Sequence, residues 1–465
     1  MVDEPPAYAV PPAPIVDPAA GPPGRGRRRL VAAIAVALVA VGGVAAVLVA
    51  TGRLGPPAKP AARVAIVDPD GALAIVDGQG GNRVVHAPAG TAFRFPAWSP
   101  DGTRVAAVAN TDTGAAIRVY STATDGSASP DGTVVYQSDA SAPFYLYWTP
   151  DGRAITFLTQ EADSLALRSV PADGSAAATV LREGNPMYWT WEDGDRMLVH
   201  TGADTSAFLG RVATDGSTVT TVAGLPGVFR APAASADGKY EAYVVSKPGG
   251  SSAVVVAASD GSATHEAPVF GPAAFEFAPA TPQLAYIGAG EGDPQAPLPL
   301  GPLRIVDAAT GDVRKLAADD VVSFFWSPDG SRIATIGIST PAAPGSARLG
   351  GPAAATARLV STRPDGGVGP RVAAAEGIDV ALQFVDVATG TATPAQVVSL
   401  SPLYVNQILP YFDQYALSHR VWSPDGTSIL LPVIDAGGNE SLEVLPADGS
   451  APRVLAPGSA GFWSP

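Results

Sequence analysis

The pattern of apolar and polar positions from about residue 63 to the end of the chain is that of short β-strands separated by tight turns. Apolar residues either alternate with polar ones or form short β-branched segments, as in half-buried and fully buried strands. Asp-Gly pairs often follow these segments, and Asp-Gly between two such segments favours a hairpin. Segments of this kind lie at residues 117–120, 165–168, 254–256, 303–306 and 442–445. The pattern predicts an all-β domain.

One turn motif, Trp-Ser-Pro-Asp-Gly, returns unchanged along the chain. It begins at Trp98, Trp326 and Trp422, and Trp148 begins a near copy with Thr in place of Ser. Pro presets φ at the second position of a type I turn, and Gly tolerates the conformation of the last position. A large aromatic residue that recurs once per unit suits packing between stacked units. We therefore predict repeated units with a Trp between neighbours.

The spacing of the motif indicates a ring of repeats. Degenerate copies at Trp191, Ala234 and Phe277 follow Trp148 at intervals of about 43 residues, and Trp326 follows a little later. Such a period is typical of arrays and propellers. Each unit is predicted to contain four antiparallel strands with two turns, the first of which is the Trp motif.

The first and last parts of this domain complement each other. Residues 63–86 lack the opening strand and its Trp, whereas residues 456–465 contain a strand that ends in Trp463 and little else. We predict that one unit is split between these two segments. With this split unit the count is eight four-stranded blades in a closed ring.

The interval between Trp326 and Trp422 is about twice as long as the others. The excess, at about residues 340–376, is rich in Ala, Gly, Pro and Arg and has no turn pair that matches the repeat. We predict that it is an exposed loop inserted into one blade and not a further blade.

The N-terminal region has the pattern of a membrane anchor. Residues 30–50 are apolar and uncharged, and as a helix they would extend about 31 Å, which matches the hydrocarbon core of a bilayer. Arginines precede this segment, which favours a cytoplasmic N-terminus. A cleaved signal peptide is the alternative, but the segment is long for one and Leu48-Val49-Ala50 is a poor small-x-small cleavage site. We predict a disordered tail (1–29), a single transmembrane helix (30–50), a Pro-rich linker (51–62) and an extracytoplasmic domain (63–465).

The Trp-Ser-Pro-Asp-Gly hairpin followed by an apolar strand resembles the repeat of the TolB-type, WD-like β-propellers over about residues 63–465. The resemblance implies a β-propeller fold. It implies no particular activity, because propellers serve binding, scaffolding and catalysis alike. Tail, anchor and propeller together also resemble the dipeptidyl peptidase IV relatives, in which a hydrolase domain follows the propeller. This chain ends where the propeller closes, so we do not expect that activity.

Charge and motif content narrow the function further. The formal net charge is −14, which disfavours nucleic-acid binding, and the absence of cysteine excludes disulfides and thiol chemistry. No nucleophile elbow, phosphate-binding loop or zinc-protease motif is present. The four histidines lie in different predicted blades at unrelated offsets, so that no metal or other cofactor is expected. They are His86, His200, His265 and His419.

Basic and aromatic residues just before the Trp positions form one candidate site. In the family that this chain resembles, the strand that ends at the Trp is innermost, so these residues line the central channel. Most of them are small or apolar; the exceptions that we single out are Arg94, Arg230, His419, Arg420 and Tyr188. Basic groups that converge on one mouth predict a pocket for a small anionic ligand. The alternative is that they bridge adjacent blades through carbonyls or acids.

A second candidate surface is the aromatic segment at residues 403–415. It contains Tyr404, Tyr411, Phe412 and Tyr415, and clustered aromatic residues are typical of protein interfaces. The alternative is a long loop that covers the edge of a blade.

These observations favour a non-enzymatic, membrane-tethered propeller that binds a protein partner or a small anionic ligand. The alternative is a propeller enzyme, a hydrolase or lyase acting on a sugar or a peptide, with its site in the central funnel. Acids, bases or metal ligands that converge in the funnel would distinguish the enzyme from the binding module.

Overall fold

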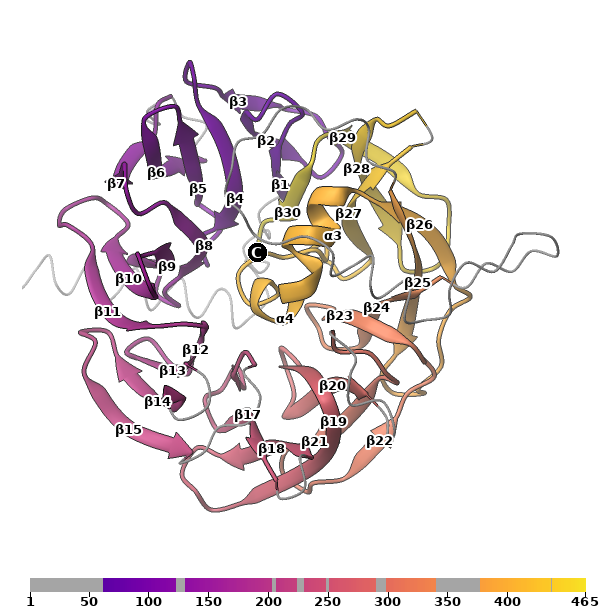
Figure 1. Cartoon of the computed structure of the whole chain (residues 1–465). Coiled ribbons are helices and arrows are strands. Elements are labelled where there is room, and N and C mark those ends of the chain that lie inside the picture. The colour runs from indigo at the N-terminus through magenta and orange to yellow at the C-terminus, as the bar shows by residue number, and fades with distance from the viewer. Residues whose placement is uncertain are drawn as a thin grey trace, which may run out of the picture. The chain divides into compact units, whose positions relative to one another are not determined.

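The part of the chain that the structure describes contains one compact unit. The computed structural model describes residues 62–122, 130–202, 206–223, 230–247, 251–289, 298–339, 377–435 and 437–465. Residues 61–465 form a compact unit in which β-strands are arranged in a ring (Figure 1).

Several predictions made from the sequence concern residues outside this part. They are the tail (1–29), the transmembrane helix (30–50), all of the linker (51–62) except residue 62, and the insertion (340–376). Among the described residues, no helix is both long and apolar enough to span a bilayer.

Four of the sheets contain four strands each, in antiparallel order. The first consists of β3 (Val84–His86), β2 (Leu73–Asp77), β1 (Arg63–Val67) and β30 (Ala460–Trp463). The second consists of β4 (Ala92–Trp98), β5 (Arg104–Thr111), β6 (Gly114–Ser121) and β7 (Thr133–Ser138). The third consists of β8 (Pro143–Trp148), β9 (Ala154–Gln160), β10 (Leu165–Pro171) and β11 (Thr179–Gly184). The fourth consists of β12 (Met187–Trp191), β13 (Arg196–Thr201), β14 (Phe208–Ala213) and β15 (Thr218–Ala223).

Two further sheets contain seven strands each. One consists of β16 (Ala233–Ala234), β17 (Tyr240–Ser246), β18 (Ser252–Ala258), β19 (Thr264–Phe277), β20 (Gln283–Ala289), β21 (Arg304–Asp307) and β22 (Val313–Lys315). The other consists of β23 (Val321–Trp326), β24 (Arg332–Ile338), β25 (Ile378–Asp386), β26 (Gln396–Leu400), β27 (Ser428–Ile434), β28 (Glu440–Pro446) and β29 (Arg453–Pro457).

Each seven-stranded sheet joins two smaller groups of strands. The first half of β19 pairs with β18 up to Val269, and the second half pairs with β20 from Phe270 onward. β26 and β27 are joined through the single pair Leu400 and Val433. The strands within each group are paired along most of their length.

The split sheet that the sequence predicts is present. β30, from the C-terminal segment, pairs antiparallel with β1, so that Trp463 lies opposite Val64 and Ala460 opposite Val67. Trp463 is buried. Strands from the two ends of the domain therefore complete one sheet and close the ring, as predicted.

The Trp-Ser-Pro-Asp-Gly turns are closed by their own side chains. In the first copy the Ser99 hydroxyl donates to Asp101 (2.6 Å), and the Arg104 amide donates back to the Ser99 Oγ (2.9 Å). The Gly102 amide donates to the Ser99 carbonyl (2.9 Å), with φ of 69° at Gly102, a conformation that favours glycine. This geometry explains why the motif keeps Ser, Asp and Gly together.

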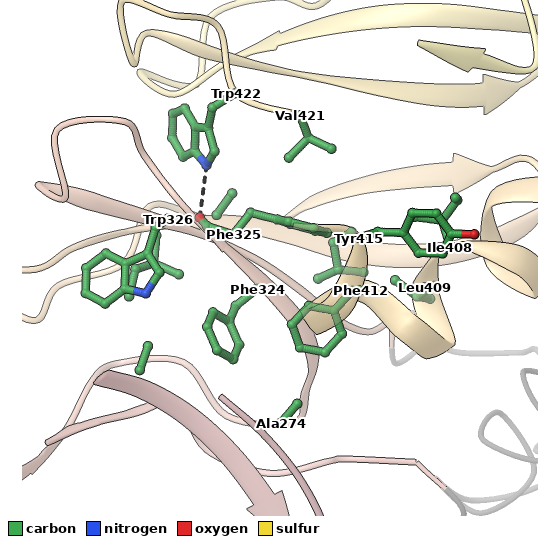
Figure 2. Packing of buried hydrophobic residues seen from close by; sticks show 14 of the residues in the cluster. Ala274, Phe324, Phe325, Trp326, Ile408, Leu409, Phe412, Tyr415, Val421 and Trp422 are labelled. Carbon is green, nitrogen blue, oxygen red and sulfur yellow. Dashed lines mark hydrogen bonds between the residues drawn. The ribbon is translucent and has the colours of Figure 1, made fainter. Parts of the chain in front are cut away.

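The Trp side chains link neighbouring sheets. Four indole Nε1 atoms each donate to a backbone carbonyl of the adjacent unit, at 2.9–3.1 Å. In every case the acceptor residue lies one position before the Trp, or the Phe in its place, of that adjacent unit. The pairs are Trp98 with Phe462, Trp148 with Ala97, Trp326 with Glu276, and Trp422 with Phe325. Figure 2 shows the last of these bonds among the buried residues. The predicted role of Trp between units is confirmed.

Arginines also bridge sheets through carbonyls. Arg63 donates to the Gly102 carbonyl (2.7 Å) and lies over the Trp98 ring, and Arg104 donates to Gly152 (2.6 Å) and lies over Trp148. The bridging role that the sequence analysis considered for other basic residues is therefore filled here by two different arginines.

At one junction between sheets, Ala234 stands in the Trp position, and an ion-pair cluster joins the sheets there. Arg211 on β14 donates to Glu192 (2.9 Å) and to Glu241 on β17. All three side chains are largely buried. Burial raises the pKa of Glu241 to about 7 although Arg211 opposes the shift. An ionic triad thus joins the sheets at this junction.

Candidate functional site

The aromatic segment is a helical plug in the middle of the ring. We use the term plug for residues 402–415, which form α3 (Pro402–Gln407), the 3-10 helix η3 (Leu409–Tyr411) and α4 (Phe412–Tyr415) (Figure 1). Ser401 caps α3 by accepting from the Tyr404 amide, and Pro402 occupies the first turn, a combination typical of a helix start. α4 packs against β19 and β23.

Most of the plug's aromatic side chains are buried inside this chain. Tyr404, Phe412 and Tyr415 are 2%, 1% and 6% exposed, and only Tyr411, at 42%, reaches the surface among the four predicted interface residues. Phe412 packs edge-on against Phe324 (Figure 2). The predicted interface is therefore corrected for three of its four residues: apolar burial holds their rings within the ring of sheets. The alternative of a loop over a blade edge is also wrong, since the segment is helical and central.

Two strained strand positions direct side chains toward the plug. Phe95 and Tyr145 have φ of 53° and 49°, and both lie at a register shift three positions before the Trp of their unit. A bulge of this kind re-aims the side chain. The Phe95 ring stacks on Tyr415 at 5.9 Å, and the Tyr145 ring meets the same residue edge-on at 5.3 Å.

Gln414 fastens the plug to the strands. Its side-chain amide donates to the Trp189 carbonyl (3.0 Å) and to the Tyr145 hydroxyl (2.7 Å), and its Oε1 accepts from the Trp189 amide (3.3 Å). The Tyr145 hydroxyl donates to the Gln414 carbonyl (2.6 Å). Gln414 is 1% exposed, so these bonds form away from solvent. The amide thus pairs with the backbone of β12 as a neighbouring strand would.

A pocket lies beside the plug. It has a volume of about 160 Å³ and is lined by Pro186, Tyr188, Arg230, Pro299, Pro410, Tyr411, Phe412 and Asp413. The Tyr188 and Tyr411 rings stand edge-on at 6.3 Å. The last four residues belong to the plug, and the others come from separate regions of the chain. The pocket therefore exists only where the plug meets the ring.

Two opposite charges border this pocket. Within the described part of the chain, the Nε of Arg230 is buried without a hydrogen-bond partner. Asp413 is 8% exposed, and burial raises its pKa to about 6 although Arg230 opposes the shift. Among the ion pairs of the described residues, none joins Arg230 to Asp413 directly. The two groups attract each other, and both line the pocket.

Comparison with known proteins finds solved structures of similar fold. No family model matches the chain, and no curated protein shows significant similarity to it. TolB from Acinetobacter baumannii is 19% identical to this chain, with a TM-score of 0.35. The match covers 54% of this chain and only 65% of the length of that TolB. A putative TolB from Agrobacterium tumefaciens is 15% identical, with a TM-score of 0.36 over 73% of this chain and 89% of its own. An oligogalacturonate lyase in complex with manganese is 11% identical, with a TM-score of 0.44 over 83% and 84% of the two chains.

The chain is a β-propeller. Its structural neighbours include TolB propellers at low identity, in keeping with the resemblance carried by the turn motif. The neighbours include TolB proteins and a lyase alike, and the likeness concerns the fold alone.

The pocket brings together some of the residues singled out from the sequence. Arg230 and Tyr188, proposed there as ligand-binding residues, meet Tyr411 and Phe412, proposed as interface residues. Arg94 does not line the pocket: it is exposed on β4 of the propeller. Arg420 does not line it either, and it is also exposed. Two candidate sites thus merge into one, without all of their members.

His419 is a core residue of the propeller. It is 2% exposed, its Nδ1 lies 2.6 Å from the Ser418 hydroxyl, and its ring packs against Tyr415 and Phe462. Burial lowers its pKa to about 3. The expectation of a positive charge at His419 is therefore corrected, because the neutral imidazole is favoured in this apolar environment.

Asp413 is the main functional candidate that the sequence analysis did not single out. It is the only charged residue between residues 396 and 418. A lone carboxylate within an apolar, aromatic segment could have served as a signal, since such groups are seldom buried without a partner. Gln414, which follows it, gave no comparable signal.

A second polar cluster involves β8 and β19. Glu276 of β19, whose Oε2 is buried without a hydrogen-bond partner among the described residues, has a pKa raised to about 8 by burial and then by Asp413. Tyr147, with a pKa raised to about 12 by burial, interacts with both Glu276 and Arg420. Carboxyl groups with raised pKa values occur at catalytic sites and in structural networks alike. Among the described residues, no group of three acids or histidines is placed to hold a metal ion.

Proposed function

We propose that this protein is a membrane-tethered, extracytoplasmic β-propeller that binds a small ligand with an anionic group in the pocket beside the plug. The observation that carries the proposal is Arg230. Its Nε is buried at a pocket wall and has no hydrogen-bond partner among the residues that the structure describes. Leaving a charged donor unsatisfied in this way costs stability, and an anionic group of a ligand would satisfy it.

The pocket wall supports the same function. Three aromatic rings and three prolines surround the two charged groups. Binding sites for small molecules are usually concave and largely apolar, with a few polar groups that fix orientation. Gln414 holds the plug in place, so the pocket is preformed, which lowers the entropic cost of binding.

We favour binding over catalysis because Asp413 and Glu276, which interact and both have raised pKa values, do not share the pocket. Asp413 lines it, whereas Glu276 does not. A general acid and a general base would both have to reach one substrate.

The strand pairing also supports a count of eight blades. Dividing one seven-stranded sheet within β19 and the other between β26 and β27 gives two blades each. In the last blade Trp422, which bridges to Ile429, takes the place of the inner strand. Together with the four four-stranded sheets, these divisions give the eight units that the motif spacing predicts.

Replacing Arg230 with Met is expected to weaken ligand binding. A screen of small carboxylic acids that includes amino acids, read out as thermal stabilisation of the full-length protein, should identify ligands. Loss of a charge-assisted contact worth about 1.5–3 kcal/mol should weaken their binding roughly ten- to hundredfold.

Arg94→Met is the matched control. Arg94 occupies the same register, four residues before the aromatic position of its unit, but is exposed and outside the pocket. This variant should bind like the wild type. Unchanged binding by Arg230→Met, or the absence of any ligand among the acids, would contradict the proposed function.

The proposed topology has its own test. The arginines before residue 30 and the apolar segment at 30–50 support a cytoplasmic N-terminus. Protease added to intact cells should release or digest the propeller and leave an N-terminal epitope tag protected. Protection of the whole chain in intact cells, with digestion after lysis, would place the propeller inside the cell.

A further inference from the structure

The pocket presents two charges of opposite sign to one ligand. Arg230 and Asp413 both line it, and no direct ion pair joins them within the described residues. Asp413 is held by its own helix, where its Oδ1 accepts from the Gln414 amide (3.0 Å). Moving the carboxyl group to Arg230 would break this bond.

A ligand with a single charge would satisfy one of these groups and be repelled by the other. A simple carboxylate at Arg230 would lie near the Asp413 carboxylate, and a simple ammonium at Asp413 would lie near the guanidinium. In a desolvated site such like-charge contacts are strongly unfavourable. A ligand that carries both charges would pair its anionic group with Arg230 and its cationic group with Asp413.

The remaining walls limit the size and character of that ligand. The aromatic rings of Tyr188, Tyr411 and Phe412 and three prolines supply apolar surface. The volume of about 160 Å³ is close to that of a cavity that accommodates benzene, about 150 Å³. The pocket thus has room for a ligand of roughly six to ten non-hydrogen atoms.

We infer that the pocket selects a small zwitterion, namely a free α-amino acid with a short apolar side chain. Its carboxylate pairs with Arg230, its ammonium pairs with Asp413, and its side chain lies against the tyrosine and proline walls. A peptide end is a poorer fit, because an N-terminus supplies only the cation and a C-terminus only the anion. This inference rests on the proposed function and adds the chemical class of the ligand.

The pH dependence of binding follows from the groups around Asp413. These are Arg230, which favours its ionised form, and Glu276 and Tyr188, whose pKa values respond to its charge. The pKa of Asp413 is about 6 in the absence of ligand. Below that pH the carboxyl group is protonated and cannot pair with an ammonium. Affinity for the zwitterion should therefore rise as the pH increases from about 5 to 7.

The test compares three ligands that share one side chain. Valine carries both charges, isovalerate lacks the ammonium and isobutylamine lacks the carboxylate, and neither analogue is larger than valine. Calorimetric titration of the full-length protein at pH 7.5 should show binding of valine, with the two analogues at least about tenfold weaker. Glycine, alanine, proline and leucine, titrated in parallel, define the preferred side chain.

Two variants should reverse the preference. Asp413→Asn removes the repulsion of a simple anion, so isovalerate should bind as well as or better than valine. Arg230→Met should weaken valine more than isobutylamine. Near-ultraviolet circular dichroism identical to that of the wild type would show that the plug is intact in both variants.

The outcomes separate this inference from the proposed function. If isovalerate binds the wild type as tightly as valine, the pocket is a simple anion site, and the zwitterion inference is wrong while the proposed function stands. If none of the five amino acids binds at millimolar concentration, the inference is overturned. Binding of valine that does not change between pH 5 and 7 would also contradict the role of Asp413.

Discussion

Deletion of residues 456–465 is expected to unfold the propeller at temperatures at which the full-length chain remains folded. The deletion removes β30, which pairs with β1, and with it Phe462 and Trp463, which are 2% and 3% exposed. Loss of each large buried aromatic side chain costs roughly 3–5 kcal/mol. Since a domain is usually stable by only about 5–15 kcal/mol, the loss of two such side chains and a strand should be close to the whole stability.

The effect of this deletion extends beyond the missing side chains. The Trp98 indole would lose its acceptor, the Phe462 carbonyl, and β1 would become an exposed sheet edge. Thermal unfolding followed by far-ultraviolet circular dichroism measures the loss. Val454→Ser, a change at a residue of β29 that is 60% exposed, is the control and should alter the stability by less than about 0.5 kcal/mol. A truncated protein that melts with the full-length chain would show that the ring does not depend on this closure.

The parts of the fold that could be predicted from the sequence are those encoded locally. The Ser99, Asp101 and Gly102 side chains and backbone close their turn within a few residues, so the same residue order marks the turn wherever it occurs. The Trp positions repeat because the indoles of Trp98, Trp148, Trp326 and Trp422 each donate to a carbonyl of an adjacent unit at the same point. Periodic local chemistry of this kind can be recognised in one sequence without any knowledge of distant contacts.

The candidate site was harder to predict because it depends on distant contacts. Arg94 and Arg230 share one register in the repeat, yet one is exposed and the other lines a pocket. The difference arises from the plug, about 180 residues after Arg230, which meets the ring on one side. His419 was misjudged for the same reason, since its charge depends on the aromatic rings that the fold gathers around it. Sequence position alone does not supply these neighbours.

The aromatic residues of the plug were recognised, but their partner was not. Clustered Tyr and Phe residues mark buried interfaces between chains and buried surfaces within one chain equally well. A signal that could have favoured the second interpretation is the helix start at Ser401 and Pro402, followed by an apolar segment. In the part of the chain that the structure describes, α4 covers β19 and β23 on the inner side of the ring (Figure 1).

Replacing Gln414 with Leu is expected to release the plug from the strands. Leu fills a similar volume but leaves the Trp189 amide and carbonyl without their partners, and it removes a donor to Tyr145. Each unsatisfied buried group costs about 1–3 kcal/mol, so a total loss of about 2–5 kcal/mol is expected. Urea unfolding measures this loss, and hydrogen exchange should show faster exchange of the plug amides than of the strand amides.

Gln407→Leu is the matched control, because it makes the same change at a half-buried position on α3 of the same plug. Its stability should stay within about 0.5 kcal/mol of the wild type. Since Asp413 precedes Gln414 and lines the pocket, the Gln414 variant should also lose ligand binding, whereas the control should retain it. Equal stability and equal exchange rates in the two variants would mean that apolar packing of Phe412 and Tyr415 alone holds the plug. The hydrogen bonds of Gln414 would then be a consequence of the plug's position and not its cause.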